Sequence, residues 1–178
     1  FVAILGAIVA GGIWGAIPGL LKAYRNVNEV VASIMLNYVA MYLNTIWIKA
    51  VIFNPDNNGA MFVKSTAVTP TLNLEFFFTG SSINVGILVA LLVVIILHIV
   101  LKRTTFGFEL KSVGFNKDAS KYSGMNSKRN IVYSMIISGA IAGLAGGLIY
   151  LVSDKYISAG TVLATQGFTG IAISLLGL

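Results

Sequence analysis

The sequence has 178 residues, of which 57% are hydrophobic and only 10% are charged, and its mean hydropathy is +0.88. These values lie far from the average of soluble domains, so the composition predicts an integral membrane protein. The formal net charge of +6 does not indicate a nucleic-acid-binding protein, because most of it lies in one stretch, residues 102–130, and not along a spread basic face.

The first apolar segment, residues 1–17, is rich in glycine, and three glycines recur at four-residue intervals: Gly11, Gly15 and Gly19. Small residues at this spacing let two membrane helices approach closely. We expect Pro18 to end or kink the helix. Residues 19–28, which contain Lys22 and Arg25, then form a short cytoplasmic connection. Because the sequence begins and ends inside apolar runs, we expect a piece of a longer protein.

The second apolar segment, residues 29–52, carries a polar stripe. At 100° per residue, a narrow sector of this helix holds Ser33, Asn37, Ala40 and Asn44. Asparagine in hydrocarbon needs a partner or water. The stripe therefore either bonds to a neighbouring helix or faces a hydrated substrate path. Residues 53–82 are predicted to form a long outward-facing loop that covers a site or docks a partner.

Three further apolar segments complete the predicted spans. Residues 83–101 are long enough to cross the hydrocarbon core. Residues 131–152 repeat the four-residue glycine spacing, so this helix should pack inside a bundle; its glycines are Gly139, Gly143 and Gly147. Residues 166–178 form a truncated span or a re-entrant half-helix. The predicted fold is an all-α, polytopic membrane helical bundle.

Two of these segments resemble each other. The sequence GAIVAGGIW at 6–14 is similar to GAIAGLAGG at 139–147. The predicted topology directs the first segment inward and the second outward, so the pair is a possible trace of inverted repeats, a common plan in transporters.

Residues 102–130 form the long polar stretch between two spans. They contain seven of the twelve Lys and Arg residues against two acids, Glu109 and Asp118, which gives a formal charge of +5. Lys and Arg close to a span resist translocation, so this segment is expected on the cytoplasmic side.

Within this stretch the local chemistry predicts a helix over residues 117–123. Asn116 can cap its first turn, Asp118 complements the helix dipole, and Gly124 can take the left-handed conformation that ends a helix. Small residues leave room for another protein surface, and an aromatic anchor follows them; these residues are Ala119, Ser120, Tyr122 and Ser123. The alternative is a solvated loop whose cations contact anionic lipid headgroups.

The sequence contains no catalytic motif of the HExxH or GxSxG type, no paired carboxylates within a span and no phosphate loop of the GxxxxGK[ST] type. It also has no cysteine, which excludes thiolate metal sites and cysteine nucleophiles. We therefore expect a chain that is not an enzyme, has no catalytic or metal site, and does not itself hydrolyse ATP.

Several of these stretches, in this order, resemble one family: the permease subunits of binding-protein-dependent ABC importers, in the branch that handles ribose, branched-chain amino acids and nucleosides. The resemblance is carried by LKSVGFNKDASKYSGMN at 110–126, ISGAIAGLAGG at 137–147 and GFTGIAISLLG at 167–177. The stretch GLLKAYRNVNEVVASIMLNYVA at 19–40 is most similar to nucleoside-type members.

The resemblance implies that the helix at 117–123 is a coupling helix, which docks on a separate ATP-binding subunit. The implied coupling residues are Gly114, Phe115, Asn116, Ala119, Ser120, Tyr122, Ser123 and Gly124. The family pattern often has proline where this chain has Lys117, a departure that an initial helical turn tolerates. Combined with the polar stripe, the resemblance suggests these substrate-path residues: Ser33, Asn37, Asn44, Gln166 and Phe168.

The resemblance also implies partners and a location. The chain itself would bind no cofactor, while ATP and Mg²⁺ would bind the partner ATPase. The other implied partners are a second permease subunit, an outer solute-binding lipoprotein and membrane lipid, with no nucleic acid, and the location is the bacterial cell membrane. The function that the resemblance implies is that of a permease subunit for a nucleoside-like solute. The alternatives to this function are a sugar or branched-chain amino acid permease and a non-transporting membrane scaffold.

Overall fold

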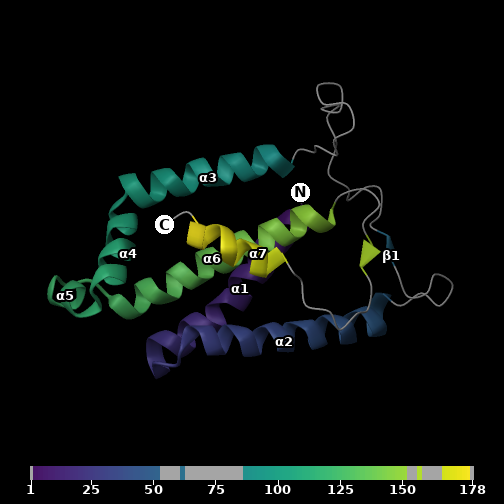
Figure 1. Ribbon diagram of the computed structural model, residues 1–178, viewed down its shortest axis with the longest axis horizontal. Coiled ribbons are helices and arrows are strands. Elements are labelled where there is room, and N and C mark those ends of the chain that lie inside the picture. Colours follow the sequence, from purple (N-terminus) through teal and green to yellow (C-terminus); the bar gives the residue numbers. More distant parts are fainter. Residues whose placement is uncertain (1, 53–60, 63–85, 152–155, 158–165, 177–178) are drawn as a thin grey trace. The chain divides into compact units, whose positions relative to one another are not determined.

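The computed structural model describes residues 2–52, 61–62, 86–151, 156–157 and 166–176 (Figure 1). Within these residues, four helices are long and apolar enough to cross a membrane. They are α1 (Val2–Arg25), α2 (Glu29–Trp47, continued by a π-helical turn over Ile48–Ile52), α3 (Gly86–Arg103) and α6 (Ser127–Tyr150). The predicted all-α, multi-pass membrane fold is therefore confirmed.

The remaining described elements are short. Three helices are α4 (Thr105–Phe115), α5 (Lys117–Tyr122) and α7 (Gln166–Leu176). Two strands of two residues each, β1 (Met61–Phe62) and β2 (Tyr156–Ile157), pair with one another. Apart from β1, the predicted outer loop at 53–82 lies outside the described residues.

The chain divides into two compact units. The first unit comprises residues 1–32 and 62–156 and holds α1, α3, α4, α5 and α6. The second unit comprises residues 33–61 and 157–178 and holds most of α2 together with α7.

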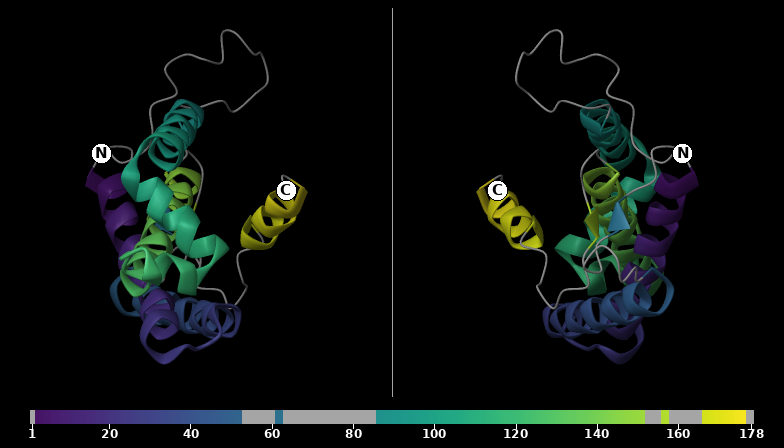
Figure 2. Two further views of the ribbon diagram at one scale, coloured as in Figure 1. Left: turned by 90° about the vertical axis from the view of Figure 1, so that its left-hand side faces the viewer. Right: turned by 90° about the vertical axis from the view of Figure 1, so that its right-hand side faces the viewer.

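In the first unit, α1 and α6 pack against each other through their glycines (Figures 1 and 2). A Cβ atom at Gly15 would lie 2.9 Å from Cα of Gly139, and a Cβ atom at Gly11 would lie 2.8 Å from Cα of Gly143. Residues with increasing sequence numbers in α1 contact residues with decreasing sequence numbers in α6, so the two helices are antiparallel. The predicted close approach at both glycine patterns is confirmed, and the two patterns are each other's partners.

Helix α1 continues through Pro18 to Arg25, so of the two predicted effects of Pro18, an end to the helix is wrong and a kink stays a prediction. Proline removes one backbone N–H from the hydrogen-bond ladder, but its fixed φ is compatible with a helix, and membrane helices tolerate the loss. Pro18 and the following Gly19 are both buried, so packing favours continuation of the helix at this point. The predicted connection at 19–28 shortens to residues 26–28.

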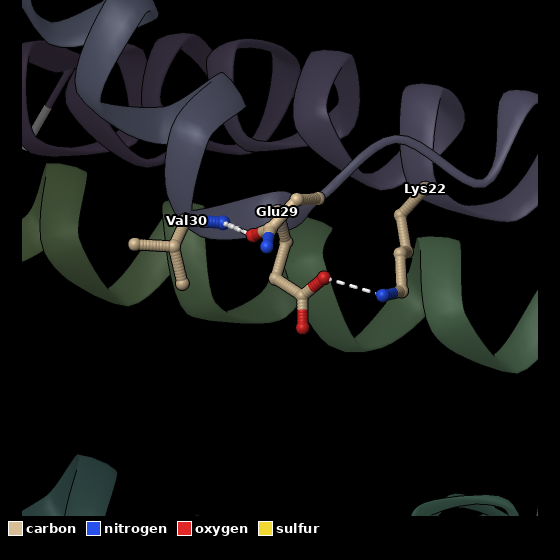
Figure 3. A network of polar contacts seen from close by, with 4 residues as sticks. Lys22, Glu29 and Val30 are labelled. Atoms are coloured by element: carbon tan, nitrogen blue, oxygen red, sulfur yellow. Dashed lines mark hydrogen bonds and ion pairs between the residues drawn. The ribbon is translucent and has the colours of Figure 1, made fainter.

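Two asparagines make this tight turn between α1 and α2. Asn26 takes a left-handed φ of 54°, which lets the N–H of Val27 donate to the carbonyl of Leu21 at 3.3 Å and closes the end of α1. The Asn28 side chain accepts a hydrogen bond from the N–H of Val30 at 2.9 Å and begins α2. Lys22 and Glu29 then form an ion pair across the turn (Figure 3).

Helix α4 lies in the first part of the stretch at 102–130, where the sequence analysis predicted a helix over residues 117–123 and did not predict this one. Thr104 caps its start by accepting a hydrogen bond from the N–H of Gly107 at 3.1 Å. Gly107 is buried directly against the backbone of Val100 and Leu101 at the end of α3. The chain therefore turns from α3 into α4 without a loop, since only a residue without Cβ fits at this corner.

We predict that Gly143→Ala destabilises the chain, because its Cβ would collide with the backbone of Ala7 and lie 3.0 Å from Cα of Gly11. The expected loss in the free energy of unfolding is about 1–3 kcal/mol, measured by denaturant titration in detergent micelles. Gly146→Ala is the matched control on the same helix, because no described atom lies within 4 Å of its added Cβ. Equal stability of the two variants would contradict the observed packing.

Candidate functional site

The antiparallel packing of α1 and α6 brings basic residues to one end of the first unit. The end of α1 carries Lys22 and Arg25, and the start of α6 carries Lys128 and Arg129. The Lys128 ammonium lies 5.4 Å from the ring centroid of Tyr24, which links the two helix ends directly. Cations from separate stretches of sequence therefore gather at the same end, as the positive-inside rule requires for a cytoplasmic face.

At the basic end of the first unit, Asn116 defines the junction between α4 and α5. The backbone N–H of Asn116 donates to the carbonyl of Ser112 and ends α4. Its side-chain oxygen accepts from the N–H groups of Asp118 and Ala119, both at 3.0 Å, and begins α5. At the other end of α5, Gly124 has a φ of 79°. The predicted capping by Asn116 and the left-handed glycine are both confirmed.

The inner face of α5 is held to the start of α6 by two serines. Ser120 is only 4% exposed, and its hydroxyl lies 3.2 Å from that of Ser127. Both hydroxyls also lie within hydrogen-bond distance of the carbonyl of Lys117, at 2.9 and 3.2 Å; because each hydroxyl has one proton, one of them donates to this carbonyl and the other donates to the neighbouring serine. Ser120 was expected to help leave room for an approaching protein, and the structure corrects this expectation, because the residue is buried inside the turn.

The other predicted coupling residues are exposed. Phe115, which precedes α5, is 91% exposed, and Tyr122, its last residue, is 95% exposed. Ala119 lies between them in sequence and is exposed as well. The remaining exposed members of the predicted set are Gly114, Asn116, Ser123 and Gly124. Two exposed aromatic side chains, one at the end of α4 and one at the end of the short, capped α5, are typical of a surface that binds another protein. We call Phe115, Ala119 and Tyr122 the α5 surface.

A basic recess lies beside α5. Its volume is about 540 Å³, and its lining includes Lys117, Lys121 and Lys128 together with the single carboxylate of Asp118. Three ammonium groups against one carboxylate favour an acidic group on whatever occupies the recess.

Two contacts that the sequence motifs did not indicate fix α4 to α6. The side-chain N–H of Asn130 donates to Glu109 at 3.0 Å. One turn earlier on α4 and one turn later on α6, the rings of Phe106 and Tyr133 meet edge to face with centroids 6.0 Å apart. The available signal was that Glu109 is one of only two carboxylates in the basic stretch at 102–130. Its pairing with a residue 21 positions away cannot be read from local patterns.

The predicted substrate-path residues lie on α2 and α7. Because α2 is helical over this range, Ser33, Asn37 and Asn44 share one face, and all three are exposed. Gln166 is the first residue of α7, and Phe168 is 60% exposed on the same helix. The polar side chains of this set that the structure describes therefore lie on one face of α2. The described residues contain no cluster of three His, Cys, Asp or Glu side chains suited to a metal ion.

Comparison with protein families finds one match over the whole chain. The model of the family described as "Branched-chain amino acid transport system / permease component" matches residues 1–178. No solved structure matches the chain.

Three curated relatives are similar over almost all of this chain. The guanosine ABC transporter permease protein NupP of Bacillus subtilis is 42% identical over 98% of the chain and 50% of its own length. The nucleoside ABC transporter permease protein NupB of Lactococcus lactis is 35% identical over 96% of the chain and 48% of its own length. The glucose ABC transporter permease protein TsgB13 of Haloferax volcanii is 30% identical over 97% of the chain and 47% of its own length. The chain thus spans about half the length of these relatives.

We predict that Asn116→Ala frays α5, because the N–H groups of Asp118 and Ala119 lose their acceptor. Loss of an N-cap costs about 1 kcal/mol, so amide hydrogen exchange at these two residues should speed up about five-fold. Asn116→Asp keeps a side-chain acceptor and should exchange at the wild-type rate. Unchanged exchange in the alanine variant would show that the cap does not hold the helix.

Proposed function

Because the chain belongs to the family of branched-chain amino acid transport system permease components, we propose that it is the transmembrane permease subunit of an ABC importer for a nucleoside-like solute. The observation that carries the proposal is the match of the family model to all 178 residues. The solute class follows from relatives named as guanosine and nucleoside permeases, at 42% and 35% identity. A sugar as solute has weaker support, because the relative named for glucose is 30% identical.

In this proposal a separate ATP-binding subunit docks on the α5 surface. The exposed rings of Phe115 and Tyr122 supply apolar area at the contact, and Ala119 between them lets the partner approach closely. The lysine-lined recess beside α5 favours a partner with acidic side chains. ATP and Mg²⁺ bind the partner, since this sequence has no phosphate loop.

The basic end of the first unit then lies in the cytoplasm of a bacterial cell, with α1, α2, α3 and α6 in the plasma membrane. A solute-binding lipoprotein delivers the solute at the opposite face. A second permease subunit completes the path, to which this chain contributes Ser33, Asn37 and Asn44 from α2, and Gln166 and Phe168 from α7. On α2, exposure of Asn37 and Asn44 lets their side-chain amides contact water or the second subunit.

We predict that Ala119→Glu abolishes energised uptake in vesicles that contain the whole importer. A charge placed in the docked surface without a partner weakens binding of the ATPase by about ten-fold or more, which co-purification and nucleoside uptake both report. Solute capture by the binding protein should survive.

Lys111→Glu, an exposed change on α4, is the control for added negative charge and should leave uptake unchanged. Normal uptake by the Ala119→Glu importer would contradict docking at α5.

We predict that a cysteine at Asn37 reacts with a water-soluble thiol reagent, because the α2 stripe faces a hydrated path in the assembled importer. These 178 residues contain no cysteine, so they contribute no background to the reaction, and the importer without the added cysteine is measured alongside. Met35→Cys, which lies two residues away and so on another side of the helix, is the control and should be shielded by lipid or a partner. Protection of position 37 in every nucleotide state would favour the scaffold alternative.

A further inference from the structure

Asn130 has the most deeply buried polar side chain among the described residues, with 1% exposed. It lies in the first turn of α6, at the basic end of the first unit. Its Nδ2 atom donates to Oε2 of Glu109 on α4 at 3.0 Å. Its Oδ1 atom is buried and has no hydrogen-bond partner among the described residues.

Packing alone does not account for an amide at this position. A buried carbonyl oxygen without a hydrogen bond costs free energy that a leucine of similar volume would avoid. The bond to Glu109 is directional and joins two helices, so the amide instead selects one arrangement of α4 on α6. Buried polar groups fix one arrangement of packed helices in some proteins.

Neighbouring contacts reinforce the same arrangement. Phe106 of α4 meets Tyr133 of α6 one turn from the Glu109–Asn130 bond. Ser120 of α5 bonds to Ser127 of α6 three residues before Asn130. Both helices that lead to the α5 surface are thus attached to the first two turns of α6, which packs by its glycines on α1.

We infer that Asn130 is a positioning residue for transport: through Glu109 it fixes α4 to α6, so that a displacement of α5 by the ATPase moves α6 as one body with it. The inference rests on the proposed function. Without this bond, α4 shifts relative to α6 when the ATPase closes, so less solute is moved for each ATP that is hydrolysed.

The first test compares solute moved per ATP hydrolysed in proteoliposomes that contain the complete importer. Asn130→Ala should lower this ratio by about five- to ten-fold, the scale of one ordinary hydrogen bond, while hydrolysis continues. Glu109→Gln retains an acceptor for Nδ2 and should keep the wild-type ratio. Ser134→Ala is the matched control on α6, because its hydroxyl bonds only to the carbonyl of Ile131 in the same helix.

A merely structural role gives a different result. It would lower the amount of assembled importer or its melting temperature, and leave the ratio per assembled importer unchanged. A wild-type ratio in Asn130→Ala therefore overturns the inference. Should that variant fail to assemble, Glu109→Ala removes the same bond at a half-buried position and must show the lowered ratio.

A second test replaces the hydrogen bond by a covalent link. The double variant Glu109→Cys and Asn130→Cys, in a chain without other cysteines, is joined by a short, reducible reagent that reacts with two thiols. The unjoined importer should be poorly coupled, the joined importer should recover the wild-type ratio, and reduction should remove the recovery. A joined importer that stays poorly coupled contradicts the inference. Failure of the wild-type chain to transport with any ATPase would instead overturn the proposed function.

Discussion

The structure of the first unit depends on the direct approach of two backbones, those of α1 and α6. Gly11 and Gly15 on one helix and Gly139 and Gly143 on the other leave no side chain between them. In a membrane the helices gain little from burying apolar surface, since lipid is equally apolar, so close van der Waals contact is what holds them together. This contact also fixes the antiparallel order that places Lys22, Arg25, Lys128 and Arg129 at one end, and the surface around α5 is built on that end.

The elements that the sequence predicts well are those with local causes. Asn116 and Gly124 bound α5 because a side-chain acceptor and a left-handed glycine act within one helical turn. The glycine spacing on α1 and α6 predicts close packing because it depends on one helical period. The family resemblance agrees with the match of the family model over the whole chain. The cytoplasmic orientation of residues 102–130 was inferred from charge and stays a prediction.

Elements with non-local causes were missed or misplaced. Pro18 stays inside α1 because α6 packs against that part of the helix, which no local rule contains. Ser120 is buried because Ser127, beyond the turn, bonds to it. Helix α4 and the Glu109–Asn130 bond depend on the corner at Gly107 and on the place where α6 begins. The inverted-repeat relation between α1 and α6 stays a prediction, as do the roles of the coupling and substrate-path residues.

The glycine contact between α1 and α6 has a mechanical consequence. Main-chain atoms have no rotamers, so a seam made of them cannot absorb a small displacement by rearranging side chains, as an ordinary hydrophobic core can. A force that displaces α6 must therefore either move α1 together with it or separate the two helices. The pair of α1 and α6 is therefore expected to move as one rigid body, because no side chains separate the two backbones at the contact.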